Sequence, residues 1–130
     1  MVYIGYPVNI EEALRLFNLT FNEQLKSPYH YDVQTRDFIN REINKFGINY
    51  YILDKNLHVI GFDLDNKLGD FSKNHISIDE SVMILLEYKK KVKDAMKLAN
   101  VDLSEIEITH MEGEDVIMNN PEPFLINYNY

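Results

Sequence analysis

The stretch INYYILDKNLHVIGFDL, residues Ile48 to Leu64, decides the fold of this chain. It contains two runs rich in β-branched and aromatic residues, and the turn-forming residues Asp54, Lys55 and Asn56 separate them. This pattern predicts a β-hairpin in which Asn56 takes a left-handed conformation. Because a three-residue link joins only antiparallel neighbours, the two strands are expected to run in opposite directions.

Helical patterns lie on both sides of this hairpin. Asn9 with Glu12 and Ser77 with Glu80 have the spacing of N-terminal capping boxes. The first predicted helix carries an apolar stripe at Ile10, Leu14, Phe17, Phe21 and Leu25, and the second runs from about Val33 to Phe46, with Gly47 as its stop. The third is expected to run to about Asn100 and to bury one face, formed by Ile78, Val82, Leu85, Val92, Met96 and Ala99.

The remaining strand signals are shorter. Val2–Tyr6 predicts a strand that Pro7 ends, and Glu105–Met111, a turn at Glu112–Glu114 and Val116–Met118 predict a second hairpin. Residues 121–130 are expected to form an edge strand or a loose tail. Together these elements predict one α+β domain over residues 1–130, with a mostly antiparallel sheet of four to six strands and about three helices packed on one face.

Composition limits the classes of partner. The 130 residues include no cysteine and carry a formal charge of −8. Negative charge repels phosphate backbones and anionic membranes, so we expect neither nucleic acid nor a membrane as partner. No window approaches eighteen apolar residues and the N-terminus lacks the features of a signal peptide, which predicts a cytoplasmic location, or the host cytoplasm for a viral protein.

The segment FDLDNKLGD, Phe62 to Asp70, places two aspartates two residues apart after an apolar run. It resembles the FDLDGTLxD loop of the haloacid dehalogenase superfamily of phosphoryl-transfer enzymes. The resemblance implies that Asp63 is the nucleophile and Asp65 the general acid/base, with magnesium held by Asp63 and the carbonyl of Asp65. Asp70 is the third carboxylate of this alternative cation site.

The same segment has a structural interpretation. Asn66 and Lys67 stand where that family has Gly-Thr, and the antiparallel hairpin differs from the parallel central strand of that fold. In a half-buried strand Ile60 and Phe62 would face the core while Asp63 points to water. We therefore interpret the segment first as a strand end and its loop, and keep the cation site as the alternative.

No other pattern predicts catalysis. The four histidines form no metal-binding motif, Gly-rich phosphate loops and nucleophile elbows are absent from the sequence, and no cofactor is expected. His58 and His110 alternate with apolar strand residues, which favours hydrogen-bonded strand histidines. The lysine-rich run at residues 89–93 contains i, i+4 pairs with acids, Glu87 with Lys91 and Lys90 with Asp94, which indicates a solvated helix face.

Protein binding is the remaining hypothesis. Glu112, Glu114 and Asp115 at the second hairpin's tip, with Glu105, Glu107 and Glu122, predict an acidic patch that docks a basic partner. Tyr50 and Tyr51 are candidate contact residues because tyrosine is enriched in interfaces. We expect a non-enzymatic adaptor, inhibitor or assembly factor, of phage, viral or immunity type given the abundance of residues with AT-rich codons. Homo-oligomerisation through a strand edge or the C-terminal tail is a further alternative.

Overall fold

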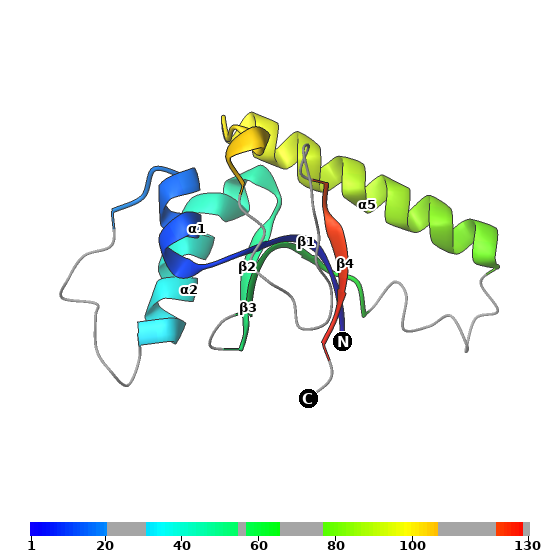
Figure 1. Ribbon diagram of the computed structural model, residues 1–130, viewed down its shortest axis with the longest axis horizontal. Coiled ribbons are helices and arrows are strands. Elements are labelled where there is room, and N and C mark those ends of the chain that lie inside the picture. Colours follow the sequence, from blue (N-terminus) through cyan, green and yellow to red (C-terminus); the bar gives the residue numbers. More distant parts are fainter. Residues whose placement is uncertain (21–30, 55–56, 66–76, 107–121, 129–130) are drawn as a thin grey trace.

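The computed structural model describes residues 1–20, 31–54, 57–65, 77–106 and 122–128 (Figure 1). These residues form one antiparallel four-stranded sheet and three α-helices, which confirms the predicted α+β class. The strands are β1 (Val2–Val8), β2 (Asn49–Asp54), β3 (Leu57–Asp63) and β4 (Phe124–Asn127). The helices are α1 (Ile10–Leu16), α2 (Tyr31–Ile43) and α5 (Ile78–Leu98), with two 3₁₀ turns, η2 (Asn44–Phe46) and η3 (Leu103–Glu105).

The strand order is β2-β3-β1-β4, and every neighbouring pair is antiparallel. The predicted hairpin is confirmed: Tyr50 of β2 lies opposite Ile60 of β3, which in turn lies opposite Tyr6 of β1. β4 is the edge strand predicted within residues 121–130, and it pairs with β1 from Val2 to Gly5.

The predicted end of the first strand was wrong. β1 continues through Pro7, which lies opposite Val59, and ends at Val8. A proline cannot donate to the sheet ladder and is tolerated where a strand lacks a second neighbour. Because β4 pairs with β1 only as far as Gly5, β3 is the one partner of β1 at Pro7 among the described strands.

The core lies between the sheet and the helices. Its largest cluster joins residues from all three helices to one face of the sheet: Tyr6, Val8, Ala13, Ile39, Ile43, Tyr50, Ile60, Val92, Ala95 and Met96. Successive strand residues point to opposite faces, so a smaller cluster of Tyr3, Leu53, Val59 and Ile126 belongs to the other face. The helices therefore pack on one face, as predicted.

Local hydrogen bonds explain where the helices begin. The side-chain oxygen of Asn9 accepts a bond from the backbone N–H of Glu12 at 2.6 Å, and that of Ser77 accepts one from Glu80 at 3.2 Å. Both N-caps are those predicted from the sequence. α2 and η2 together end at Gly47, whose φ of +87° favours glycine and confirms the predicted stop.

The end of α1 corrects the prediction of a helix to Leu25. Asn18 takes a left-handed conformation with φ of +53°, and the N–H of Leu19 donates to the carbonyl of Leu14 at 2.8 Å. The N–H of Asn18 also donates to the carbonyl of Arg15 at 3.0 Å. The two bonds form a Schellman motif, which terminates a helix. Asn100 and Val101 end α5 in the same way, close to the predicted boundary. Phe21 and Leu25 lie outside the described residues.

The buried face predicted for α5 is only partly correct. Its buried residues, Val92, Ala95 and Met96, all lie in the C-terminal half, whereas Ile78 is 82% exposed and Val82 is also exposed. At 1.5 Å per residue the helix is roughly 31 Å long, while four strands about 4.8 Å apart span roughly 15 Å. The N-terminal half of α5 extends past β4 (Figure 1), and so past the edge of the sheet that the described strands form.

Three further predictions concern the loops. Glu105, expected to start a strand, closes the turn η3 instead, because the side chain of Asp102 accepts the N–H of Ser104 at 2.9 Å. The rest of the second hairpin and the conformation of Asn56 lie outside the described residues.

None of the described helices has both the length and the hydropathy needed to cross a membrane.

Candidate binding surfaces

An open hollow of about 530 Å³ lies between α1 and η3. We call it the acidic hollow; its lining residues are Asn9, Glu11, Glu12, Arg15, Ser104 and Glu105. Three glutamates against one arginine leave an excess of two negative charges in this lining. The sequence separates its two sides by about 90 residues, so only the fold brings them together.

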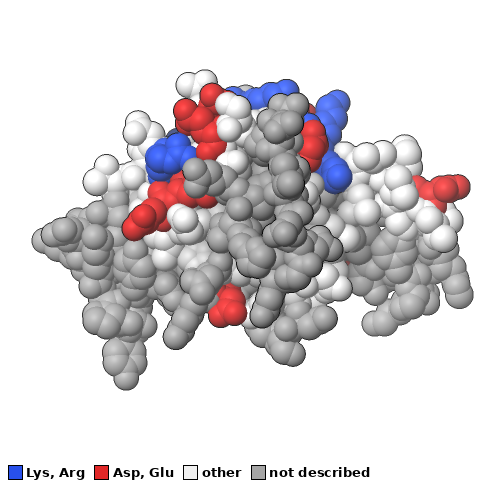
Figure 2. All heavy atoms as spheres, in the orientation of Figure 1, with Lys and Arg blue, Asp and Glu red and all other residues white. Residues whose placement is uncertain are grey.

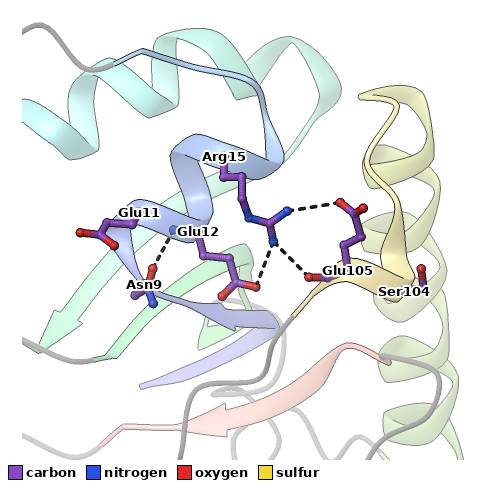
Figure 3. A pocket seen from close by; sticks show the side chains of 6 residues that line it. All are labelled: Asn9, Glu11, Glu12, Arg15, Ser104 and Glu105. Atoms are coloured by element: carbon purple, nitrogen blue, oxygen red, sulfur yellow. Dashed lines mark hydrogen bonds and ion pairs between the residues drawn. The ribbon is translucent and has the colours of Figure 1, made fainter.

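Arg15 holds the two sides of the acidic hollow together. Its guanidinium donates to a carboxylate oxygen of Glu105 at 3.2 Å and to the backbone carbonyl of Glu105 at 3.1 Å. The same group lies 3.9 Å from a carboxylate oxygen of Glu12. Figure 3 shows Glu12 and Glu105 turned toward Arg15 from opposite sides, so that Arg15 bridges α1 and η3.

The carboxylates of the acidic hollow differ in their exposure. Glu12 is 8% exposed, whereas the side chain of Glu105 is 60% exposed and Glu11 lies on the exposed rim, pointing away from Arg15 (Figure 3). The buried and bridged Glu12 is fixed in position, and the two exposed carboxylates remain accessible to solvent. Such an arrangement suits a cationic side chain, because ordered carboxylates accept charge-assisted hydrogen bonds from ammonium or guanidinium groups.

The hydroxyl that lines the acidic hollow is bonded within the turn η3. This hydroxyl, that of Ser104, donates to Asp102 at 2.6 Å, and neither histidine nor cysteine is among the six described residues that line the hollow. The two hydrogen bonds from Ser104, first from its hydroxyl and then from its backbone N–H, lower the pKa of Asp102. The Asp102–Ser104 pair therefore fixes the shape of η3.

The predicted contact tyrosines lie in or beside the core. Tyr50 is fully buried and its hydroxyl hydrogen-bonds with His58, which is 2% exposed. This contact confirms the hydrogen-bonded strand histidine expected at position 58. Tyr51 is half-buried and packs against Tyr3, with ring centroids 5.0 Å apart. A partner contact through either tyrosine stays a prediction.

The aspartates of the alternative cation site bind backbone groups. Asp63 accepts a hydrogen bond from the N–H of Asp65 at 2.9 Å, and Asp65 accepts one from the N–H of Val2 at 2.7 Å. The first bond is local to the end of β3, and the second ties that end to the start of β1. Within the described ranges, no three His, Cys, Asp or Glu side chains group as metal ligands. Asp70 lies outside those ranges, so the cation site stays an untested alternative.

The residues of the predicted acidic patch likewise lie partly inside and partly outside the described ranges. Glu112, Glu114 and Asp115 lie outside the described residues, as do Glu107 and His110. Glu105 is part of the acidic hollow, and Glu122 forms an ion pair with Lys93 of α5. The sequence analysis did not select Glu11, Glu12 or Arg15 as binding residues. The capping box already accounted for Glu12, and no neighbouring residue indicates the distant turn that completes the acidic hollow.

A second exposed surface is apolar. Ile78, Val82, Met83 and Leu86 are exposed on the N-terminal half of α5, and we call this set the α5 face. Exposed apolar side chains that gather in one patch mark interaction surfaces. The signal was present in the sequence, since VMILL at residues 82–86 is apolar around the whole helix rather than along one stripe.

Comparison of the chain with models of protein families, with curated proteins and with solved structures finds no match. Function is therefore inferred from the geometry of these two surfaces.

Proposed function

We propose that this protein is a non-enzymatic binding module that docks a second protein with a basic surface into the acidic hollow. The observation that supports this proposal is the open hollow of about 530 Å³, in which Arg15 bridges Glu12 and Glu105 and Glu11 adds a third carboxylate at the rim. A lysine or arginine side chain of the partner would enter it and bind the exposed carboxylates of Glu11 and Glu105.

The charge of the whole chain supports the same class of partner. At −8 it attracts basic surfaces over long range and raises the rate of encounter with them. Long-range attraction alone gives little specificity, whereas the exposed carboxylate of Glu105, held by Arg15, offers a cationic side chain a defined position. An adaptor, inhibitor or assembly factor acting in the cytoplasm, such as a phage or viral accessory protein or an immunity-type protein, fits this chemistry.

The test compares two variants with equal net charge. Glu11→Lys with Glu105→Lys reverses the rim of the acidic hollow, and Asp37→Lys with Asp94→Lys reverses two exposed acids outside it. The probe is a fluorescently labelled octa-arginine peptide, and anisotropy gives its dissociation constant at about 0.15 M salt, where the Debye length is about 8 Å.

We expect the hollow variant to weaken peptide binding by about tenfold and the control variant by about twofold, because a local contact contributes more than screened distant charges. Equal losses in the two variants would show that only net charge attracts the peptide, and would contradict the proposal. Thermal unfolding of both variants verifies that each is folded.

A further inference from the structure

The α5 face lies on a part of the helix that the rest of the described fold leaves exposed. None of the residues from Ser77 to Glu87 is fully buried, although Ser81, Ile84 and Leu85 are half-buried. The ring of Tyr88, one residue further on, packs edge-on against Phe62 with centroids 5.3 Å apart. Ile78, Val82 and Leu86 follow one another at i, i+4 and i+8, so they form one row along the exposed side. Met83 lies beside that row.

Charges of opposite sign stand at the two ends of the α5 face. Asp79 and Glu80 occupy the first turn of α5, before most of the apolar row. Lys89 and Lys90 follow Leu86 by three and four residues, so they continue the same side of the helix. Figure 2 shows uncharged residues along this half of α5, with acidic atoms at its N-terminal end and basic atoms near its middle.

We propose that two copies of this chain associate through the α5 face, with their α5 helices antiparallel about a two-fold axis near Ile84. In this arrangement Val82 of one copy lies opposite Leu86 of the other, so these apolar residues cover each other, and Ile78 lies opposite Lys90. Asp79 of each copy then lies opposite Lys89 of its partner, which adds two symmetric ion pairs.

The order of acid, apolar row and base makes the α5 face complementary to itself. A two-fold axis across the helix exchanges its ends, so the acidic end of one copy meets the basic end of the other. A parallel pair would place like charges opposite each other, which is unfavourable. Two-fold dimers with identical contacting patches are also the commonest oligomers of soluble chains.

The proposed dimer interface is small, and its area limits the expected strength of self-association. The segment from Ile78 to Lys90 is roughly 20 Å long, so the interface buries less than the about 800 Å² per partner of a standard complex. We expect a dissociation constant between about 1 μM and 1 mM. Two copies of charge −8 also repel each other, and about 0.15 M salt screens most of that repulsion.

Sedimentation equilibrium of the full chain from about 10 μM to 1 mM tests the association across that range. The average mass of the natural chain is expected to rise from one copy toward two. Leu86→Glu places a charge in the apolar row and is expected to weaken the dimer at least about 100-fold. Leu98→Glu is the matched control, because Leu98 is also an exposed leucine of α5, at 74% against 55% for Leu86, and lies outside the α5 face.

A charge exchange tests the antiparallel arrangement. Asp79→Lys and Lys89→Glu are each expected to weaken self-association, because each places like charges opposite each other twice in the dimer. A mixture of these two variants restores two opposite-charge pairs, so it is expected to dimerise about tenfold more tightly than either variant alone.

Three results would overturn the proposal: one-copy mass at every concentration, equal effects of Leu86→Glu and Leu98→Glu, or a mixture that dimerises no better than its components. A one-copy chain whose residues 78–90 lose NMR intensity on addition of phosphatidylglycerol vesicles would assign the α5 face to a membrane instead. The acidic hollow is intact in all these variants, so these results do not depend on the octa-arginine experiment.

Discussion

The hydroxyl of Tyr50 and the Nδ1 atom of His58 share a hydrogen bond inside the protein, across the two strands of the β2–β3 hairpin. Both side chains are buried, and their rings meet edge-on with centroids 5.5 Å apart. The hydroxyl of Tyr6, on the same side of the sheet, is also buried but has no hydrogen-bond partner among the described residues. Of these two buried tyrosine hydroxyls, that of Tyr50 is therefore bonded and that of Tyr6 is not.

This contrast predicts opposite effects of removing the two hydroxyls. Tyr50→Phe takes a partner from buried His58 and is expected to lower the free energy of unfolding by about 1–3 kcal/mol. Tyr6→Phe removes an unbonded polar atom and is expected to leave that free energy unchanged or raise it by about 1 kcal/mol. Urea denaturation measures both, and a loss in Tyr6→Phe as large as in Tyr50→Phe would contradict this account of the core.

The burial of Tyr6 also predicts how the stability of the protein changes at alkaline pH. Burial, and then the negative charge of Glu122, raise the pKa of Tyr6 above its ordinary value of 10.0. A raised pKa means that the folded state favours the neutral phenol, so this contribution to stability is complete below pH 10 and is lost as pH rises further. Tyr6→Phe is expected to lose less stability than the natural chain between about pH 9 and pH 11, as followed by circular dichroism. Identical pH profiles would contradict the assignment.

Gly5 and Gly61 lie opposite each other where β1 and β3 approach most closely. A Cβ at Gly61 would collide with the backbone carbonyl of Ile4, and a Cβ at Gly5 with that of Ile60. Gly61→Ala is expected to cost about 3 kcal/mol of stability, because backbone atoms on both strands must move. Gly47→Ala is the control: its Cβ meets open space, so only the left-handed φ is strained, at about 1 kcal/mol. Equal losses would remove the close approach as the cause.

The hydrogen bonds to Asp102 predict how the stability of the protein changes at acidic pH. Hydrogen bonds from Ser104 lower its pKa below the ordinary 3.8, so the ionised form stabilises the turn η3. The sign follows from linkage: this contribution is present above pH 3.8 and is lost as pH falls through the lowered pKa of the folded state. The natural chain is expected to exceed Asp102→Ala in melting temperature at pH 6, with the gap closing below pH 3.8. A gap that does not change with pH would mean that the charge of Asp102 has no part in it.

The sequence predicted the local features of the fold well. The hairpin, the caps at Asn9 and Ser77, and the stop at Gly47 depend on residues close in the chain, and each is present. The end of α1 was missed because a left-handed Asn18 competes with an apolar stripe that would otherwise continue the helix. Whether Asn18 ends the helix depends on how the neighbouring chain packs, which a stripe does not reveal.

The candidate surfaces were less predictable, because they depend on distant parts of the chain. The acidic hollow exists only where Arg15 meets Glu105, and no sequence pattern indicates that these two residues pair. The α5 face is exposed because the helix is longer than the sheet is wide, so Ile78 and Val82 extend past the core that their spacing predicted for them. Of the hollow's residues, only Glu105 was among the acids considered for binding.

The most direct test of the proposed function is an amide-resolved NMR titration with Nα-acetylated arginine amide, compared with Nα-acetylated citrulline amide, so that neither probe carries a charged α-amino group. The two probes have nearly the same shape, but only arginine amide carries a guanidinium. We expect arginine amide to cause saturable shifts confined to the amides of Glu11, Glu12, Arg15, Ser104 and Glu105, and citrulline amide to cause none there. Shifts spread over all acidic surfaces, or equal shifts with both probes, would contradict a cation-binding acidic hollow.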